Sequence, residues 1–176
     1  LQSKNWRNDI ALWSASYEAQ PSVLTNLTGK ARALRNAGRA EEALAAMNAN
    51  ESTYSDQALF FQSRGATQQV LGKLSEAESD YRKALSLNTQ LRISGNDLAL
   101  ILARSGRLEE GIQVARRVTQ AHPRYAKGFN TLGALLLDSR QLDSAENALL
   151  QAESLAHKNP NTACNLGSVY WLQMQE

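Results

Sequence analysis

The sequence predicts an all-α fold, in which antiparallel helix pairs stack into a solenoid with a repeat of 34 residues. Glycine recurs at this interval, at Gly38, Gly72 and Gly106, as expected for a turn that every repeat makes at the same point. Within residues 24–176, two further columns at the same spacing contain nothing but Ala or Gly. Larger apolar residues recur around these columns with helical spacing. Together the three observations indicate stacked helices rather than a globule with one core.

Overlaying the chain on itself at this interval divides it into four complete repeats and two half repeats, within one solenoid over residues 1–176. The complete repeats are 24–57, 58–91, 92–125 and 126–159. Residues 1–23 have the phase of a lone second helix, and residues 160–176 have the phase of the first helix of a fifth repeat. We therefore expect the chain to be a fragment of a larger protein.

The two columns of small residues predict where paired helices come closest. The first column consists of Ala31, Gly65, Ala99, Gly133 and Gly167, and the second of Ala43, Ala77, Gly111 and Ala145. Glycine within a helix costs about 1 kcal/mol relative to alanine, so it needs a packing reason. The close crossing of two helices supplies that reason. Leucines around the columns, such as Leu98, Leu102 and Leu108, form the predicted core.

The second helix of each pair begins with acidic residues or serine. These residues are Glu41 and Glu42, Ser75 and Glu76, Glu109 and Glu110, and Asp143 and Ser144. Carboxylates and hydroxyls at this end of a helix interact favourably with the helix dipole and with unpaired N–H groups. Because they recur at one phase, they indicate helix capping rather than catalysis.

The pattern is most regular in residues 129–152, FNTLGALLLDSRQLDSAENALLQA, and in residues 162–171, NTACNLGSVY. It resembles the tetratricopeptide repeat, and the resemblance covers essentially the whole chain. This resemblance implies a right-handed superhelix whose concave face receives a peptide or an extended segment of a partner. Lys30, Arg64 and Gln68 depart from the pattern, because they occupy columns that are apolar in the other repeats.

The N-terminal segment carries a second resemblance. Residues 6–21, which begin WRNDIALW and end in Gln-Pro, resemble the segment that leads into the tetratricopeptide tail of polytopic, glycosyltransferase-like membrane proteins. This resemblance implies an accessory tail that lies outside the cytoplasm. The alternative is that an apolar stripe covers the end of the solenoid. The stripe consists of Trp6, Ile10, Trp13 and Tyr17.

Composition and charge exclude several classes of function. The chain has 176 residues, of which 43% are hydrophobic and 20% charged, and its mean hydropathy of −0.43 is typical of one folded domain. No apolar run approaches the roughly 18 residues that a membrane helix needs, so we expect no membrane insertion by this chain. The formal net charge is only +2 and no stacking code recurs, so nucleic acid is not an expected partner.

No catalytic or cofactor-binding motif occurs in the sequence. The single cysteine, Cys164, cannot form an internal disulfide or a thiolate cluster, and neither His122 nor His157 has further ligands at metal-binding spacing. Gly-rich phosphate loops and Ser/His/Asp arrangements are also absent. We therefore expect no catalytic residue, no metal and no cofactor, and a protein-interaction scaffold rather than an enzyme, although the whole protein could be a membrane enzyme.

The predicted binding residues lie on the first helix of each pair, outside the core columns. They are Thr28, Arg32, Arg35, Gln62, Gln69, Asn96, Arg104, Lys127 and Asn130. Gln62, Asn96 and Asn130 share one column, which suits amides that bond an extended backbone, and arginines nearby favour an acidic partner. The Lys/Asn/Arg clamp of chaperone-binding repeats does not match, because Thr28 and Arg32 stand where its Lys and Asn would be. The sequence leaves open the partner's identity, the oligomeric state and the compartment, extracytoplasmic or cytoplasmic.

Overall fold

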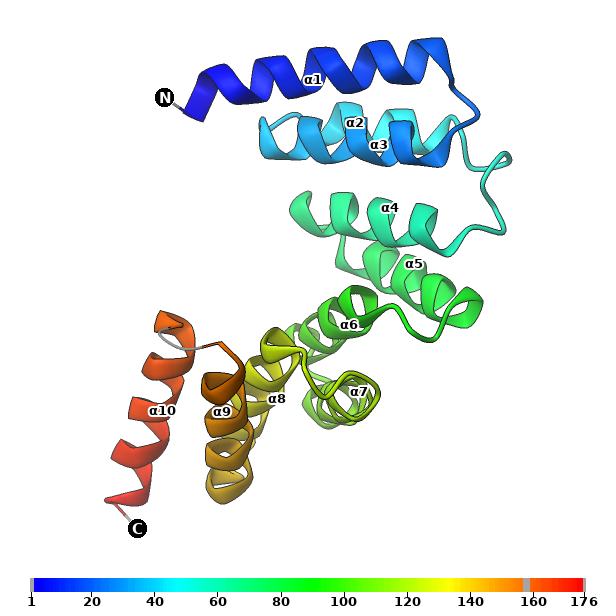
Figure 1. Cartoon of the computed structure of the whole chain (residues 1–176). Coiled ribbons are helices and arrows are strands. Elements are labelled where there is room, and N and C mark those ends of the chain that lie inside the picture. Colours follow the sequence, from blue (N-terminus) through cyan, green and yellow to red (C-terminus); the bar gives the residue numbers. More distant parts are fainter. Residues whose placement is uncertain (1, 157–158, 176) are drawn as a thin grey trace. The chain divides into compact units, whose positions relative to one another are not determined.

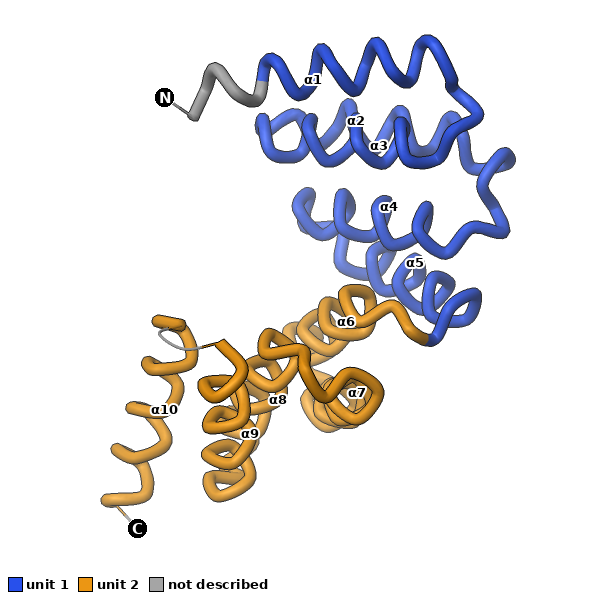
Figure 2. Tube along the Cα trace, viewed as in Figure 1, with its two compact units in different colours: residues 1–89 blue, residues 90–176 orange. Residues whose placement is uncertain are grey.

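The computed structural model describes the backbone of residues 2–156 and 159–175, and the side chains of residues 7–156 and 159–175. Within these residues the chain forms ten helices and no strand, which confirms the all-α prediction (Figure 1). The helices are α1 (Gln2–Ala19), α2 (Leu24–Asn36), α3 (Ala40–Asn48), α4 (Ala58–Val70), α5 (Leu74–Leu87), α6 (Arg92–Arg104), α7 (Leu108–Ala121), α8 (Ala126–Asp138), α9 (Leu142–Leu155) and α10 (Pro160–Gln173). Residues 1–89 form one compact unit with α1–α5, and residues 90–176 form a second with α6–α10 (Figure 2).

Helix starts follow the same interval in both units. The first helices α2, α4, α6, α8 and α10 begin at Leu24, Ala58, Arg92, Ala126 and Pro160, and the second helices α3, α5, α7 and α9 begin at Ala40, Leu74, Leu108 and Leu142. Each first helix from α2 to α8 packs on the second helix that follows it. At the two ends, α1 packs on α2, and α10 packs on α8 and α9. Each unit is therefore a stack of helix pairs.

A residue with left-handed backbone follows each first helix from α2 to α8 at its turn. The glycines Gly38, Gly72 and Gly106 have φ angles of 77°, 72° and 79°. In the first of these turns the Arg39 N–H donates to the Leu34 carbonyl at 2.9 Å, which satisfies an acceptor that the helix end leaves unpaired. The fourth turn has Arg140 with φ 60°, a conformation that costs a residue with a side chain about 1–2 kcal/mol.

The two small-residue columns meet where paired helices cross. A Cβ atom added to Gly133 would lie 3.3 Å from the carbonyl oxygen of Ala145. One added to Gly111 would lie only 2.7 Å from the carbonyl oxygen of Ala99. Each contact joins one member of the first column to one member of the second within the same pair. The small residues therefore allow the two backbones to touch.

The acidic residues of the second helices lie in the first turn, but they do not cap it. The N-cap residues of α3, α5, α7 and α9 are Arg39, Lys73, Arg107 and Gln141, and none makes a side-chain cap hydrogen bond. Arg39 instead pairs with Glu42 at 2.6 Å. The expectation of side-chain capping is therefore wrong, whereas the favourable interaction of first-turn carboxylates with the helix dipole still applies.

Arg64, which departs from its apolar column, is buried in a network of opposite charge. Its Nε and Nη2 donate to the Asp80 carboxylate at 2.7 and 2.9 Å, and its Nη1 lies 2.8 Å from Glu51. The rings of Phe60 and Phe61 lie 5.2 and 5.4 Å from the guanidinium. The hydrogen bonds that Arg64 donates to Asp80 raise the pKa of Arg64, and Arg64 in turn lowers the pKa of Glu51. A charge is stable at this apolar position because two carboxylates pair with it.

The N-terminal apolar stripe packs on α2 through Trp13, whose ring occupies the space over Gly29. Tyr17 of the same stripe donates a hydrogen bond to Asn50 at 3.0 Å. The side chain of Trp6 lies outside the described residues. In the part of the chain that is described, no helix is both long and apolar enough to cross a membrane.

Replacing Gly111 by Ala should destabilise the chain, although alanine favours helix. The new methyl group would meet the Ala99 carbonyl, and we expect relief of this contact to cost about 1–3 kcal/mol, which exceeds the gain of about 1 kcal/mol in helix propensity. Gly167→Ala is the matched control, because nothing lies within 4 Å of its Cβ position. It should stabilise by up to about 1 kcal/mol. Urea denaturation measures both free energies of unfolding, and equal effects would contradict the close crossing.

Removing the partner of Arg64 should have a larger effect. Asp80 is 4% exposed and Arg64 is 7% exposed, so Asp80→Ala leaves a buried guanidinium with only Glu51 as its partner. We expect a loss of about 3 kcal/mol in the free energy of unfolding. Glu42→Ala, which breaks the exposed pair with Arg39, should leave the thermal melting temperature nearly unchanged. Similar melting of the two variants would show that the Arg64 network adds little.

Candidate functional site

Arg35, near the end of α2, is held by neutral groups of α4. Its Nη1 donates to the Ser63 carbonyl at 3.3 Å, to the Ser63 hydroxyl at 3.5 Å and to the Thr67 hydroxyl at 3.1 Å. The Thr67 hydroxyl donates in turn to the Ser63 carbonyl at 2.9 Å. These contacts use only one nitrogen of the guanidinium. Among the described residues, Nη2 and Nε of Arg35 have no hydrogen-bond partner.

Among the described residues of this unit, the charge of Arg35 has no counter-ion. Burial lowers the pKa of Arg35, and the nearby charge of Arg32 lowers it further, while the Tyr81 hydroxyl acts in the opposite direction. No described carboxylate lies within ion-pair distance of Arg35, whereas Arg39, Arg64 and Arg82 all have one. A half-buried cation held only by hydroxyl and carbonyl groups is poorly compensated. An anion that reached its free edge would make a bidentate, charge-assisted pair.

Gln69 lies on α4, the first helix of the next pair, and Tyr81 orients its side-chain amide. The Tyr81 hydroxyl of α5 donates to Gln69 Oε1 at 2.9 Å, which leaves the Nε2 group of Gln69 to donate elsewhere. Leu59 and Val70 of the same helix are 52% and 61% exposed. Their spacing relative to Gln62 and Gln69 places all four on one side of α4. This surface combines amide donors with exposed apolar groups.

The other predicted residues of the first unit make local contacts. Thr28 donates to the carbonyl of Thr25 at 3.2 Å, within its own helix. Arg32 is exposed, and its guanidinium lies 6.0 Å from the ring of Trp13. Gln62 is half-buried and already has an interaction partner. Arg35, Arg32 and Gln69 are therefore the predicted residues of this unit with the greatest capacity to bind a partner.

In the second unit two of the predicted residues, Asn96 and Asn130, make internal contacts. Asn96 is 1% exposed, so it does not present its amide to a partner as expected. The Asn130 side-chain oxygen accepts hydrogen bonds from Thr162 at 3.0 Å and from Asn165 at 3.4 Å. The expected row of surface amides is thus corrected at Asn96, which neighbouring helices enclose. Asn130 stays a prediction, because it is half-buried and these contacts engage only its side-chain oxygen.

The two basic residues predicted in the second unit differ in their surroundings. Lys127 lies 3.6 Å from the Asp97 carboxylate, and its side chain is 59% exposed. Arg104 is exposed in the last turn of α6. Their predicted contact with a partner stays a prediction.

Three residues of the site could not be chosen from the repeat pattern. Ser63 and Thr67 occupy buried positions on α4, 9% and 0% exposed, and Tyr81 stands in a core column. The sequence feature that could have identified Ser63 and Thr67 is that two hydroxyl residues lie one turn apart on a helix face that otherwise packs in the core. Such hydroxyls need partners when buried, and Arg35 supplies one.

The described side chains contain no cluster of histidine, cysteine or acidic residues that could hold a metal ion. Cys164 is exposed on α10, and His122 is half-buried after α7. His157 lies outside the described residues.

A comparison with known protein families identifies the same kind of repeat. Residues 62–91 match the sequence model of the tetratricopeptide repeat. The chain has the fold of a tetratricopeptide repeat solenoid. No curated protein sequence matches it significantly. The match lies within the repeat 58–91 and does not reach the N-terminal segment, so the resemblance of that segment to membrane glycosyltransferase-like proteins stays a prediction.

Three solved structures illustrate the likeness in fold. A thermophilic tetratricopeptide repeat (TPR) protein from Thermus thermophilus has a TM-score of 0.80 at 16% identity, over 94% of this chain and 91% of that one. YrrB, described as a TPR protein with an unusual peptide-binding site, has a TM-score of 0.72 at 16% identity, over 93% and 84%. The first TPR of Spaghetti (RPAP3), bound to the HSP90 peptide SRMEEVD, has a TM-score of 0.65 at 17% identity, over 67% and 94%.

Proposed function

We propose that the chain is a non-catalytic protein-interaction scaffold whose first unit binds an extended, acidic segment of a partner protein. The observation that carries the proposal is Arg35, a half-buried guanidinium with neutral partners and no carboxylate at ion-pair distance among the described residues. The fold itself needs no charge at this position, because Leu137 occupies the same column in the repeat 126–159. A ligand carboxylate would compensate this charge.

The unoccupied groups around Arg35 suit one kind of ligand. A carboxylate of an acidic side chain or of a chain terminus would accept from Nη2 and Nε of Arg35, with exposed Arg32 adding positive potential. The free amide of Gln69 would donate to a backbone carbonyl of the same segment. The exposed side chains of Leu59 and Val70 would contact its apolar residues.

Two of the similar folds support a peptide ligand for this chain. YrrB has a peptide-binding site, and the Spaghetti domain binds SRMEEVD, a peptide with three acidic residues of which one is the last. The mode of binding in this chain would differ from a chaperone clamp, because Thr28 and Arg32 replace its Lys and Asn. The carboxylate would instead be held by Arg35.

A screen of random peptides against the purified chain, followed by fluorescence anisotropy of the best binders, tests the proposal. We expect acidic peptides to be selected, and Arg35→Gln to weaken their binding by about 2 kcal/mol or roughly 30-fold. Arg117→Gln is the matched control, because Arg117 is exposed on α7 and lies in the other unit. Both variants change the net charge equally, so general electrostatic attraction would weaken equally in the two.

Two outcomes would contradict the proposal. Selection of peptides without acidic residues would contradict recognition of a carboxylate. Equal binding by the Arg35→Gln and Arg117→Gln variants would contradict a role of Arg35 in binding. A retained helical circular dichroism spectrum establishes that Arg35→Gln is folded.

A further inference from the structure

Arg35 and Gln69 occupy the same column of the repeat, on the neighbouring first helices α2 and α4. Three of their donor groups have no hydrogen-bond partner among the described residues, namely Nη2 and Nε of Arg35 and Nε2 of Gln69. Because α2 packs against α4, one extended segment can reach both side chains. The orientation of the Gln69 amide therefore determines which ligand group the site accepts beside a carboxylate.

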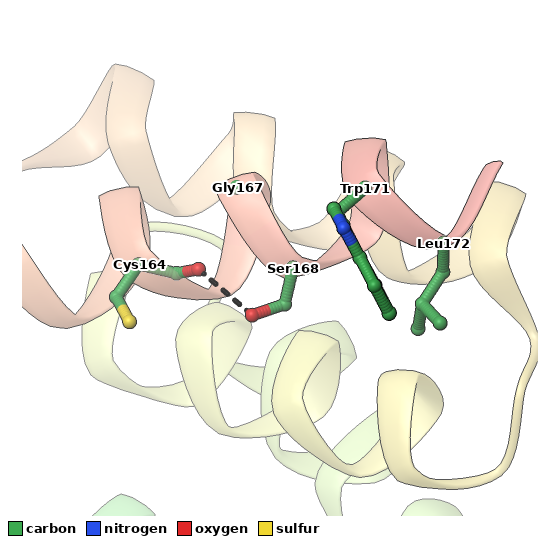
Figure 3. A pocket seen from close by; sticks show the side chains of 5 residues that line it. All are labelled: Cys164, Gly167, Ser168, Trp171 and Leu172. Carbon is green, nitrogen blue, oxygen red and sulfur yellow. Dashed lines mark hydrogen bonds between the residues drawn. The ribbon is translucent and has the colours of Figure 1, made fainter. Parts of the chain in front are cut away.

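The same column is apolar or aromatic in the second unit, where it consists of Ala103, Leu137 and Trp171. A pocket of about 400 Å³ on α10 is lined by Trp171 together with Cys164, Gly167, Ser168 and Leu172 (Figure 3). The Ser168 hydroxyl in this pocket donates to the Cys164 carbonyl at 3.1 Å, within its own helix. Packing of the repeat thus requires no polar side chain in this column, and the two in the first unit need a separate explanation.

Tyr81 of α5 fixes the orientation of the Gln69 amide. The Tyr81 side chain is 0% exposed and its ring packs over Gly65, so its hydroxyl has a fixed position. This hydroxyl donates to Gln69 Oε1 at 2.9 Å. An amide whose oxygen accepts this bond directs its NH2 group away from Tyr81. Gln69 therefore presents a donor, rather than an acceptor, to a ligand.

Arg35 determines the direction in which the Tyr81 hydroxyl points. Burial lowers the pKa of Arg35, and the Tyr81 hydroxyl opposes this shift, because the two side chains lie near each other. A cation orients a nearby hydroxyl so that the oxygen faces the charge and the O–H bond points away from it. Arg35, Tyr81 and Gln69 thus form a relay, in which the cation orients the hydroxyl and the hydroxyl orients the amide.

We propose that Tyr81 is a positioning residue of the binding site, which through Gln69 selects a hydrogen-bond acceptor about three residues from the carboxylate of the ligand. This proposal rests on the proposed function, because it concerns the same ligand. Packed helices lie about 8–10 Å apart, and an extended chain advances about 3.3 Å per residue. A segment whose carboxylate lies at Arg35 therefore passes Gln69 about three residues away. A donor at that point would face the NH2 group of Gln69 and would be rejected.

A double-mutant cycle tests the relay, with fluorescence anisotropy of one acidic peptide selected from the random library. Tyr81→Phe removes the hydroxyl but keeps the ring over Gly65, and we expect it to weaken binding roughly three- to tenfold. Gln69→Ala should weaken binding by at least the same factor. The double variant should bind no more weakly than Gln69→Ala, because Tyr81 acts only through Gln69.

Tyr54→Phe is the matched control in the same unit. Tyr54 is 1% exposed, and its hydroxyl donates to the Pro21 carbonyl at 2.6 Å. The two exchanges therefore each remove one hydroxyl that is hydrogen-bonded within the fold. Tyr54→Phe should leave peptide binding unchanged, whereas a purely structural role of Tyr81 would make the two variants alike. Circular dichroism and the melting temperature of each variant check that it is folded.

Replacing single peptide bonds of the same peptide by esters identifies the acceptor, because an ester carbonyl is the weaker hydrogen-bond acceptor. We expect one replacement, about three residues from the acidic residue, to weaken binding to the unmodified chain roughly threefold or more. The same replacement should have no effect on binding to Gln69→Ala. This comparison needs no change at Tyr81, so it stays decisive for the acceptor if Tyr81→Phe is unstable.

Three results would overturn the proposal. They are equal binding by Tyr81→Phe and Tyr54→Phe, an effect of Tyr81→Phe that persists in full in Gln69→Ala, and an ester effect that Gln69→Ala does not abolish. Each leaves the proposed function intact if acidic peptides still bind and still depend on Arg35. Selection of peptides without acidic residues would instead overturn both.

Discussion

The close approach of two helix backbones within each pair is the constraint on which the rest of the structure depends. A Cβ atom added to Gly111 or Gly133 would lie 2.7 or 3.3 Å from a carbonyl oxygen of the helix opposite, that of Ala99 or Ala145. A large side chain at either position would force the two helices apart. In the first unit the same column brings Gly65 close to α5, where an added Cβ atom would lie 3.3 Å from the carbonyl oxygen of Ala77. The glycines lower the helix propensity of their segments, but they allow the two helices to pack closely.

Two arginines differ in how the packing of the helices compensates their buried charge. Arg64 and Asp80 come from the two helices of one pair, and their separation lets a guanidinium and a carboxylate bond bidentately. Arg35 reaches across to the next first helix, where it finds only Ser63 and Thr67. The first arrangement is complete within the fold. The second leaves donors free, which is the physical basis for assigning recognition to Arg35 and structure to Arg64.

The sequence was sufficient to predict features that the repeat period controls. Turn glycines such as Gly38, the starts of helices and the small columns all recur, so one register explains them. Arg140 shows the limit of this reasoning, because its side chain gives no sign that it adopts the left-handed backbone of its glycine equivalents. The pairing of Arg64 with Asp80 was also not predictable, since both residues break the pattern and only their contact explains them.

The candidate site was predictable in part. Arg35 and Gln69 follow from their place on the first helices, but the hydroxyls that hold Arg35 and the tyrosine that orients Gln69 depend on neighbouring helices. For the same reason Asn96, which neighbouring helices enclose, is not available to a partner, and the side-chain oxygen of Asn130 is already hydrogen-bonded. A column assigns a residue to a helix face. Only the packing of the next helix decides whether its polar atoms remain available.

Nuclear magnetic resonance of the arginine Nε–Hε groups and glutamine side-chain amides would test the assignment of recognition to Arg35 most directly. Titration with an acidic peptide selected by the chain should shift the Arg35 Nε–Hε and Gln69 Nε2 signals first and most strongly, while the Arg64 signal stays in place. Large shifts confined to residues of the second unit, or none at Arg35 while the peptide binds, would contradict the account.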